Sequence, residues 1–600
     1  MLQMTAKVSN HFTLAHMPYV TNITEEGTCF SFPYKCAFPS TIIIFLLRAQ
    51  TTCKMPVYCG TSYDSTNKIW SGPKEKDFYN YEMTLGEAIV EQLHLNPDKV
   101  VQIMDSTGEQ VKAKDLLTNS KNIVRNFVAM GLKRGDVVGL YASNTTHLSA
   151  VILAAWLTGL RTHAAYEGCD KDELKIIFDL SKPKIIFCDL ENSYKAQAAN
   201  EELNLEAKIY LMHSTKDGQL PSVTELLDVT EPLPDMALFP CFPLNGDDTA
   251  AILCSSGTTG PPKGVLCSHQ TLLNCHGFQT FTSNSIGFTF SSTYWWSGLC
   301  VLKETLLKGG LRIITNQPFS PEYFLHLIER YKITHVIANP SQLAELCLKP
   351  NNFGNIAQRM NSIDTIMCCG SKVLPIIGTK MLQLLKSENQ YKRFLVTYGF
   401  SEMSAILASN YSGQLDAEGL LAPKLQVRIV DRSENLLGPN EHGEIQCWFP
   451  YKWLGYLNNP IATQKCLTDN WFRTGDIGYF DEEGCLHICS RVGDVFKSNN
   501  IQIYPEKVEN ILMKLRGVQE CCVFGQPDVI KTNLVACAVV KTKDSEGENL
   551  NEATIYRFVE EELPPVYHLK GGIYFLEQLP RTGSGKVLRR KVIEMLQKKL

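Results

Sequence analysis

The run from Ser255 to Lys263 has the composition of an anion-binding loop. It reads Ser-Ser-Gly-Thr-Thr-Gly-Pro-Pro-Lys and follows an apolar stretch that ends at Leu253. Glycines let backbone N–H groups approach an anion closely, hydroxyls donate further hydrogen bonds, and the lysine supplies mobile positive charge. Such a loop suits a polyphosphate. It is not a Walker A loop, because Pro262 stands where that motif has a glycine; the alternative is a flexible Ser/Gly turn.

The loop resembles the phosphate-binding loop of the adenylate-forming superfamily, which includes acyl-CoA synthetases, coumarate-CoA ligases and luciferases. The resemblance extends from about Thr84 to the C-terminus, and it is closest to an insect luciferase-like acyl-CoA synthetase branch. It implies that the loop binds the phosphates of ATP and that its lysine takes part in catalysis. The residues so implied are Ser255, Ser256, Gly257, Thr258, Thr259, Gly260 and Lys263.

A second motif begins at Tyr398, directly after a strand predicted over Arg393–Thr397. It resembles a family motif that ends in Thr-Glu, with Ser401 in place of the threonine. The resemblance implies that the Ser401 hydroxyl faces the α-phosphate and that Glu402 holds Mg²⁺, a hard cation that prefers oxygen ligands. Tyr398 would stack on adenine, whereas a tyrosine that merely packs is the alternative. The nucleotide-binding residues expected here are Tyr398, Gly399, Phe400 and Ser401.

A third segment, Gly370-Ser371-Lys372, follows a strand predicted over Thr365–Cys369. It occupies the place where family members present backbone to adenine. The family often has Gly-Ala-Pro there, so the side chains differ while backbone recognition would survive. We therefore expect Gly370, Ser371 and Lys372 in the nucleotide site, with a solvated loop lysine as the alternative for Lys372.

Two further motifs complete the resemblance. Asp476 lies in a Trp-x-x-Thr-Gly-Asp motif and would accept the ribose hydroxyls, and Arg491 would contact ribose or phosphate near a hinge. Lys586 lies in a Pro-Arg-Thr-Gly-Ser-Gly-Lys motif and would reach both the carboxylate and the α-phosphate. Its charge would stabilise the negative charge that develops as the carboxylate attacks.

Six positions depart from the family pattern or bear on the second step of the family's reaction. The hinge position reads Gly493, which is permissive for rotation. Lys497 matches a lysine that some members use in their second step, and Asn500 replaces a glycine beside the pantetheine tunnel. The resemblance therefore implies the family's second step, thioester formation with coenzyme A, less firmly than its first step, adenylation of the acid. An altered acid pocket is expected at Tyr294, Trp295 and Trp296, with a tryptophan pair in the structural core as the alternative.

Composition narrows the class of protein. Apolar residues make up 44% of the 600-residue chain and charged residues 20%, with a net charge of −4. This balance gives no reason to expect nucleic acid or an anionic membrane as a partner. The 21 cysteines are scattered without paired C-x-x-C units, which argues for a reduced intracellular protein and against a structural zinc site.

Alternating amphipathic and apolar segments predict an α/β fold with mostly parallel sheets. Beyond Gln426, short strands between Gly and Asn turns predict a β-rich subdomain, and Ser545–Asn551 reads as a polar loop. The family fold implies a large adenylation domain of several subdomains over residues 55–490 and a small mobile α/β lid over residues 491–600. Residues 1–54 read as an extra extension or a mis-predicted start, and their apolar run is far too short to span a membrane.

The resemblance implies an ATP- and Mg²⁺-dependent acid–thiol ligase. A carboxylic acid, fatty or aryl-alkenoic, attacks ATP to give an acyl-adenylate and pyrophosphate, and the thiol of coenzyme A then displaces AMP. The alternatives are a luciferase-type monooxygenase that oxidises its adenylate, and a catalytically impaired binding homologue. The C-terminal Lys-Lys-Leu only weakly resembles a peroxisomal address, so both peroxisome and cytoplasm stay open.

Overall fold

The computed structural model describes residues 60–214, 220–227, 243–255, 262–274, 280–348, 353–373, 375–386, 392–410, 415, 417–498, 501–528, 532–582 and 586–597. Four of the sequence expectations fall outside these residues. They concern the extension 1–54, the phosphate-loop residues 256–261, Asn500 and the C-terminal Lys-Lys-Leu.

A six-stranded sheet carries the start of the phosphate loop at one edge. In spatial order its strands are β10 (Lys263–Ser268), β9 (Thr249–Ser255), β6 (Arg161–Ala164), β5 (Val137–Tyr141), β7 (Ile185–Cys188) and β8 (Lys208–Leu211). All neighbours pair in parallel except β9 and β10, which form an antiparallel hairpin. Helices α5 (Lys171–Ser181) and α6 (Ser193–Glu202) share an apolar core with this sheet.

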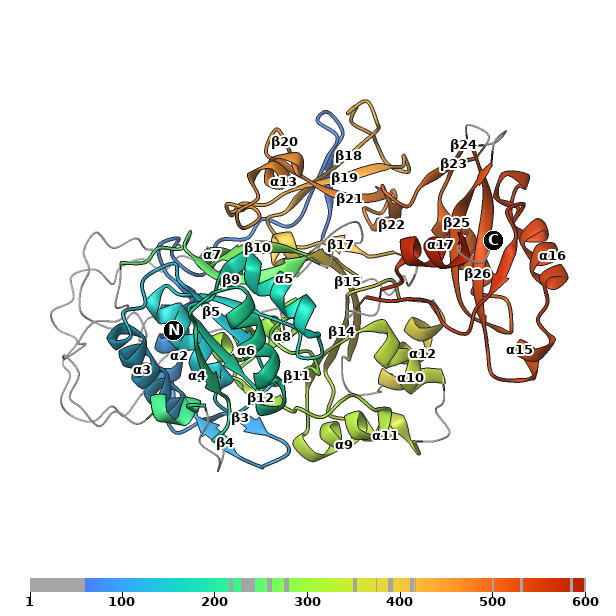
Figure 1. The fold of residues 1–600 in the computed structure, drawn as a ribbon. Helices are drawn as coiled ribbons and strands as arrows, with labels where there is room; N and C mark the ends of the chain where they lie inside the picture. Colours follow the sequence, from blue (N-terminus) through green and yellow to red (C-terminus); the bar gives the residue numbers. More distant parts are fainter. Residues whose placement is uncertain are drawn as a thin grey trace, which may run out of the picture. The chain divides into compact units, whose positions relative to one another are not determined.

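A nine-stranded sheet carries the second and third motifs. In spatial order its strands are β17 (Leu420–Leu421), β16 (Ala405–Ser409), β15 (Arg393–Phe400), β14 (Thr365–Cys368), β13 (His335–Ala338), β11 (Ile286–Phe288), β12 (Leu311–Ile314), β3 (Val100–Met104) and β4 (Gln110–Lys112). The strands from β15 to β3 are parallel, as expected for an α/β sheet. The helices α9 (Pro321–Tyr331), α10 (Pro340–Leu348), α11 (Ile356–Arg359) and α12 (Pro375–Leu385) pack against it (Figure 1).

A group of central helices shares one apolar core with both sheets. Its members are α2 (Leu85–Leu95), α3 (Ala113–Ala129), α4 (Leu148–Thr158), α7 (His269–Asn274) and α8 (Trp296–Lys308). Every residue of α4 is buried, which is why this helix is apolar all round. Thr84 caps the N-terminus of α2 with a capping box. Its hydroxyl accepts a hydrogen bond from the backbone N–H of Glu87, and the Glu87 carboxylate accepts one from the backbone N–H of Thr84.

The predicted β-rich subdomain is a seven-stranded sheet. Its strands are β1 (Ser62–Asp64), β2 (Ile69–Ser71), β18 (Gln426–Val430), β19 (Gly443–Trp448), β21 (Trp471–Phe480) and β20 (Leu467–Thr468) in spatial order, with β22 (Leu486–Arg491) on β21. The short helix α13 (Pro460–Lys465) connects β19 to β20. In Figure 1 the blue hairpin of β1 and β2 lies beside the orange strand β18, because residues far apart in sequence pair there.

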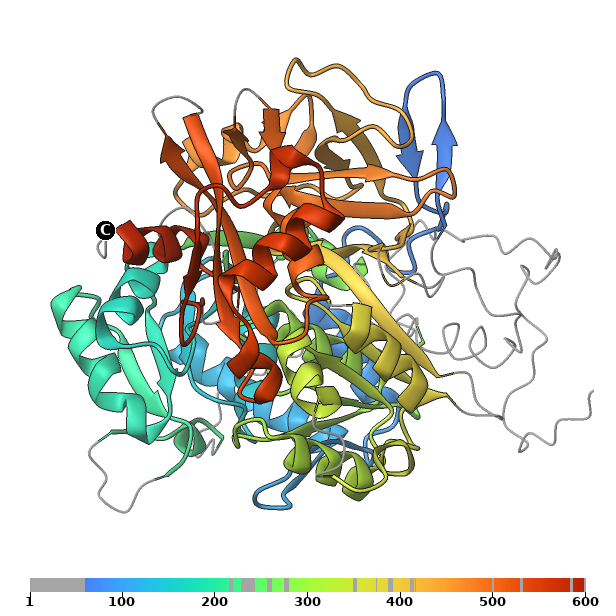
Figure 2. The ribbon, with the colours of Figure 1, turned by 90° about the vertical axis from the view of Figure 1, so that its right-hand side faces the viewer.

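The C-terminal elements form a small α/β group of their own. It contains the strand pair β23 (Phe496–Ser498) and β24 (Ile501–Ile503), the three-stranded sheet β25 (Val518–Asp528), β26 (Thr532–Lys541) and β27 (Ile573–Phe575), and the helices α14 (Pro505–Leu512), α15 (Ser545–Asn549), α16 (Glu552–Glu562) and α17 (Arg589–Gln597). These elements, orange-red to red, stay together in both views (Figures 1 and 2). They pack around two apolar cores that contain no residue of the two large sheets.

The predicted α/β fold with a large N-terminal and a small C-terminal part is confirmed. Strand β14 ends at Cys368, one residue before the end predicted for it, whereas β15 is three residues longer than predicted and includes Tyr398 to Phe400. The polar loop predicted over Ser545–Asn551 is wrong at its start: Asp544 caps the short helix α15 by accepting from the backbone N–H of Gly547. Over the described part of the chain, no helix combines the length and the apolar character that a membrane span requires.

Candidate functional site

The hairpin of β9 and β10 holds the two ends of the phosphate loop together. Ser255 and Lys263 are register partners at the loop end of this hairpin, and the backbone N–H of Lys263 donates to Oγ of Ser255 at 3.4 Å. This pairing fixes the positions of the first and last residues of the phosphate loop. The remaining residues predicted to bind phosphate, Ser256 to Gly260, belong to the part of the loop that is not described.

The carboxylate of Glu402 and the ammonium of Lys263 meet at one side chain. Glu402 lies in a 3₁₀ turn, η4 (Ser401–Met403), directly after β15, and its Oε1 accepts from the hydroxyl of Tyr456 at 2.7 Å. Nζ of Lys263 lies 4.8 Å from the centroid of the same tyrosine ring, a cation–π distance. The structure therefore brings the second motif to the end of the phosphate loop.

Asp476 is held by two partners that the sequence analysis named. It is 5% exposed, its Oδ1 lies 2.8 Å from Nε of Arg491, and its Oδ2 accepts from the hydroxyl of Tyr398 at 2.5 Å. Asp476 and Arg491 are register partners on β21 and β22, while Tyr398 comes from β15. The seven-stranded and nine-stranded sheets thus meet at this carboxylate.

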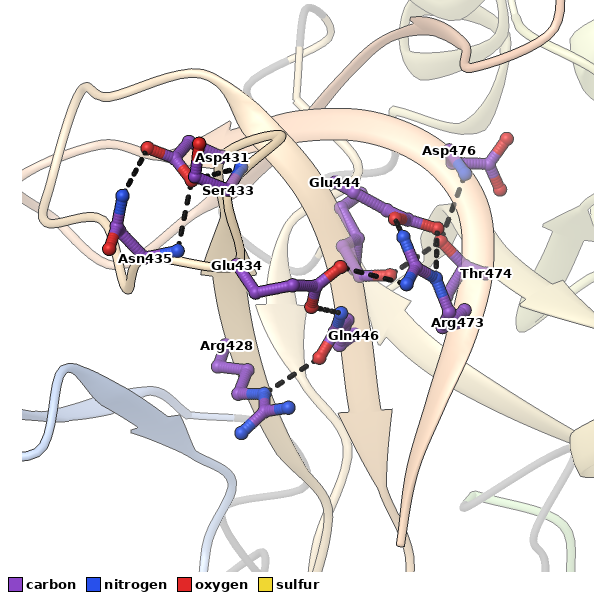
Figure 3. A network of polar contacts seen from close by, with 11 residues as sticks. Arg428, Asp431, Ser433, Glu434, Asn435, Glu444, Gln446, Arg473, Thr474 and Asp476 are labelled. Carbon is purple, nitrogen blue, oxygen red and sulfur yellow. Dashed lines mark hydrogen bonds and ion pairs between the residues drawn. The ribbon is translucent and has the colours of Figure 1, made fainter. Parts of the chain in front are cut away.

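A polar network fixes the strand on which Asp476 lies. Figure 3 shows Arg473 between two carboxylates, with NH1 2.8 Å from Oε1 of Glu434 and Nε 3.3 Å from Oε1 of Glu444. The hydroxyl of Thr474 donates to the carbonyl of Ile445 at 2.8 Å and accepts from the backbone N–H of Asp476 at 3.0 Å. Because Arg473, Thr474 and Asp476 follow one another along β21, the network sets the position of the site carboxylate.

Lys586 lies within electrostatic reach of the same groups. Its backbone N–H donates to Oγ1 of Thr582 at 3.1 Å, so the hydroxyl of the Pro-Arg-Thr motif shapes this turn. Burial lowers the pKa of the Lys586 ammonium and Arg491 adds to this effect, whereas Asp476 and Glu402 act in the opposite direction. Burial also raises the pKa of Asp476, although the guanidinium of Arg491 acts to lower it. The residues expected to act on the α-phosphate and on the ribose therefore influence each other electrostatically.

The third motif presents its backbone openly, but its lysine has a protein partner. Gly370 has φ +102°, a conformation that favours glycine, and a Cβ added there would meet nothing within 4 Å. Ser371 and Lys372 are exposed, and Nζ of Lys372 lies 3.8 Å from Oε2 of Glu506. That Lys372 binds the nucleotide stays a prediction, because the structure shows this lysine in contact with Glu506.

Phe400 and Lys497, also expected in the candidate site, contact residues outside that site. Phe400 stacks on Phe472 with ring centroids 5.0 Å apart, so its side chain belongs to the core of the β-rich subdomain. Lys497 on β23 is exposed, and its carbonyl accepts from Nδ2 of Asn533 at 2.9 Å. No ion pair or hydrogen bond joins the Lys497 side chain to the other site residues that the structure describes.

In the aromatic segment predicted to line the acid pocket, Tyr294 and Trp296 each pack against two buried apolar clusters. Tyr294 and Trp295 form an edge-to-face pair at 4.6 Å, and Trp295 also lies 6.1 Å from the ring of Tyr166. Trp296, the first residue of α8, packs against two buried apolar clusters, and its indole Nε1 is buried without a hydrogen-bond partner among the described residues. Trp296 therefore resembles a core residue more than Trp295 does.

The environment of Glu402 suits the role of a Mg²⁺ ligand. It is half-buried, Tyr456 occupies its Oε1, and Oε2 has no protein partner within the described ranges. One free oxygen on an oriented carboxylate is what a hard cation shared with phosphates needs. Within those ranges no group of three or more His, Cys, Asp or Glu side chains could enclose a metal ion. Mg²⁺ would thus be shared with ATP rather than held in a protein cage.

Tyr456 is the site residue that sequence reasoning missed. It is 7% exposed and follows a turn at Gly455, whose φ is +87°. Its flanking backbone pairs with β10, since Leu457 donates to the carbonyl of Gly264 at 2.7 Å. A single tyrosine before an Asn-Asn-Pro turn carries no signal of such pairing, so the tertiary structure alone reveals it.

Comparison with known proteins identifies the family of this chain. The chain matches the family model of the AMP-binding enzymes over residues 89–457 and that of the AMP-binding enzyme C-terminal domain over residues 507–586. It is 26% identical over 483 residues to 4-coumarate–CoA ligase-like 6 of Arabidopsis thaliana, covering 78% of this chain and 82% of that protein. It is 24% identical over 515 residues to luciferin 4-monooxygenase of Photuris pensylvanica, covering 82% and 91%.

A solved structure shares the fold. ATP-bound MatB from Rhodopseudomonas palustris superposes with a TM-score of 0.73 at 23% sequence identity, covering 86% of this chain and all of that one. The expected resemblance and fold class are thereby confirmed. Since the first family model alone covers more than half of its length, the chain belongs to the AMP-binding enzyme family, which confirms the expected class of AMP-forming acid–thiol ligase that uses ATP, Mg²⁺ and coenzyme A.

Proposed function

We propose that this protein activates a fatty or aryl-alkenoic acid as its adenylate and transfers the acyl group to coenzyme A. One observation supports it above the others: Lys263, Glu402, Asp476, Arg491 and Lys586 come from distant parts of the sequence and meet in one place. A protein that only binds a nucleotide has no need of a second lysine whose charge interacts with Asp476, the residue expected to bind the ribose.

In the first half-reaction a carboxylate oxygen attacks the α-phosphorus of ATP, and the bond to the bridging oxygen breaks with release of pyrophosphate. Lys586 would hold the attacking carboxylate against the α-phosphate and offset the developing negative charge. Lys263 and the loop would bind the phosphates, while Asp476 and Arg491 would fix the ribose. Mg²⁺, when bound at Glu402, neutralises part of the phosphate charge.

In the second half-reaction the sulfur of coenzyme A attacks the acyl carbon, and the bond to the AMP oxygen breaks. The thiol proton is lost and AMP leaves. In this structure the charges of Asp476 and Glu402 act on the Lys586 ammonium, an arrangement suited to the first half-reaction. The second would require the C-terminal part to move, and Gly493, exposed and with nothing near its Cβ position, is free to rotate.

The acid class rests on the aromatic segment and on the relatives. Trp295 offers a flat apolar surface that suits an aryl or alkyl chain. The name of the Arabidopsis relative includes 4-coumarate, an aryl-alkenoic acid, and that of the Photuris relative a monooxygenase, so both activities need to be tested.

The test is a screen of fatty and aryl-alkenoic acids by pyrophosphate release, with and without coenzyme A, followed by detection of the thioester. Acid-dependent pyrophosphate release and a coenzyme A-dependent thioester are expected. Light emission with O₂ in place of thioester formation would favour the monooxygenase. Absence of pyrophosphate release with every acid, in a protein that still binds ATP, would favour the binding homologue.

A further inference from the structure

Tyr456 stands between the two charged groups that would handle the phosphates of ATP. Its hydroxyl donates to Glu402 at 2.7 Å, and Lys263 lies over its ring at 4.8 Å. We propose that Tyr456 is a positioning residue, which orients Glu402 for Mg²⁺ and keeps Lys263 from pairing with that carboxylate. This inference rests on the proposed function, because it assigns the two charged groups to Mg²⁺ and ATP.

The hydroxyl orients the carboxylate without neutralising it. A tyrosine is a neutral donor, so Glu402 keeps its full negative charge while one oxygen is fixed and the other stays open. Burial and the charge of Glu402 raise the pKa of Tyr456 well above its ordinary value, which keeps the proton on the phenol. The donor role of this hydroxyl is therefore constant over the physiological pH range.

The ring separates the two charges. Lys263 and Glu402 form no ion pair in the part of the chain that is described, although both contact Tyr456. A direct pair would occupy the lysine donors and the carboxylate oxygen that ATP and Mg²⁺ require. The ring face attracts the ammonium weakly, so Lys263 stays near the loop and can be taken over by phosphate.

The backbone makes Tyr456 rigid enough for this role. Gly455 accepts from the N–H of Leu266 at 3.0 Å and Leu457 donates to Gly264 at 2.7 Å, so the chain on both sides of Tyr456 is tied to β10. The tyrosine therefore moves with the strand that carries Lys263. A side chain fixed in this way can preorganise its neighbours.

The test compares ATP affinity in excess Mg²⁺ with ATP affinity in chelator, measured by calorimetry without any acid. Tyr456→Phe removes the hydroxyl and keeps the ring. We expect it to leave the affinity in chelator unchanged and to reduce the gain that Mg²⁺ gives by roughly tenfold, the scale of a hydrogen bond to a charged group. Tyr456→Leu should also weaken binding in chelator, because Lys263 can then pair with Glu402.

The chain offers a matched control in Tyr451. It is also 7% exposed, its hydroxyl donates to the carboxylate of Asp77, and Lys424 lies 5.9 Å from its ring. Tyr451→Phe should change neither affinity, so general loss of stability is separated from positioning. If Tyr456→Phe reduces both affinities equally, or neither, the positioning role is wrong while the proposed function stands. If the unaltered protein binds no ATP, both are wrong.

Discussion

Nζ of Lys372 lies 3.8 Å from Oε2 of Glu506. Lys372 follows β14, on the loop expected to present backbone to adenine, and Glu506 lies in the first turn of α14. The pair thus joins the nucleotide loop to the start of the C-terminal elements. Both side chains are partly exposed, so the pair is weak and suits a contact that must open between two half-reactions.

Removing this pair should affect closure and not nucleotide affinity. At pH 9, where Glu506 is ionised, Lys372→Ala and Glu506→Gln should slow adenylate formation by similar factors, and the double variant should be no slower than either single one. The coupling between them should be about 0.5 kcal/mol, typical of exposed pairs. Single-turnover adenylation and ATP titrations provide the measurement, with the exposed Lys386→Ala as control. A large loss of ATP affinity in Lys372→Ala would instead indicate that this lysine binds the nucleotide.

The same contact predicts a pH dependence. Burial raises the pKa of Glu506 to about 8. The charged groups facing it are Lys372, Arg589, Glu509 and Glu418. Because the pKa is raised above its unfolded value of 4.5, the favourable contribution of Glu506 is fully present below pH 4.5 and is lost as pH rises through 8. Glutamine imitates the protonated acid, so the variant should escape this loss.

Glu506→Gln should therefore raise the thermal midpoint at pH 9 by a few degrees and change it little at pH 5. Calorimetric scans across this range measure the difference, and Glu560→Gln, an exposed position on α16, should follow the unaltered protein at every pH. A stabilisation that is the same at pH 5 and pH 9 would contradict the titration of Glu506.

The sequence predicted what depends on local pattern and family motif. The mostly parallel α/β sheets follow from the alternation of amphipathic and apolar segments, and Asp476, Arg491 and Lys586 follow from motifs. Partners set by tertiary pairing could not be predicted. Tyr456 meets Glu402 because its backbone pairs with β10, and Lys372 meets Glu506 because two distant elements pack together.

The two tryptophans should respond differently to truncation. Trp295 contacts the rings of Tyr166 and Tyr294, so Trp295→Ala should shift preference toward bulkier acids by roughly 10- to 100-fold with ATP affinity unchanged. Trp296 packs against two core clusters, so Trp296→Ala should lower the free energy of unfolding by about 3 kcal/mol. Acid profiles and denaturant unfolding of both variants decide this. An unchanged profile in Trp295→Ala would assign the whole segment to the core.

Lys586 should matter for one half-reaction and not for the other. Its ammonium interacts electrostatically with Asp476 and Glu402, and we expect its charge to act on the α-phosphate. Lys586→Ala should slow adenylate formation by roughly 10²–10³-fold, the scale for losing one preorganised charge-stabilising group. Capture of a synthetic acyl-adenylate by coenzyme A should be nearly unchanged, because the C-terminal part would then have moved and carried Lys586 away.

Single-turnover kinetics with acid plus ATP, and separately with adenylate plus coenzyme A, measure the two steps. Lys591→Ala is the matched control, since this exposed lysine lies on α17, five residues after Lys586. It should leave both steps unchanged, which separates the local charge of Lys586 from the basic character of the C-terminal segment. Equal slowing of both steps in Lys586→Ala would mean that the lysine acts in both arrangements or through stability, and that the movement of the C-terminal part does not divide the reaction in this enzyme.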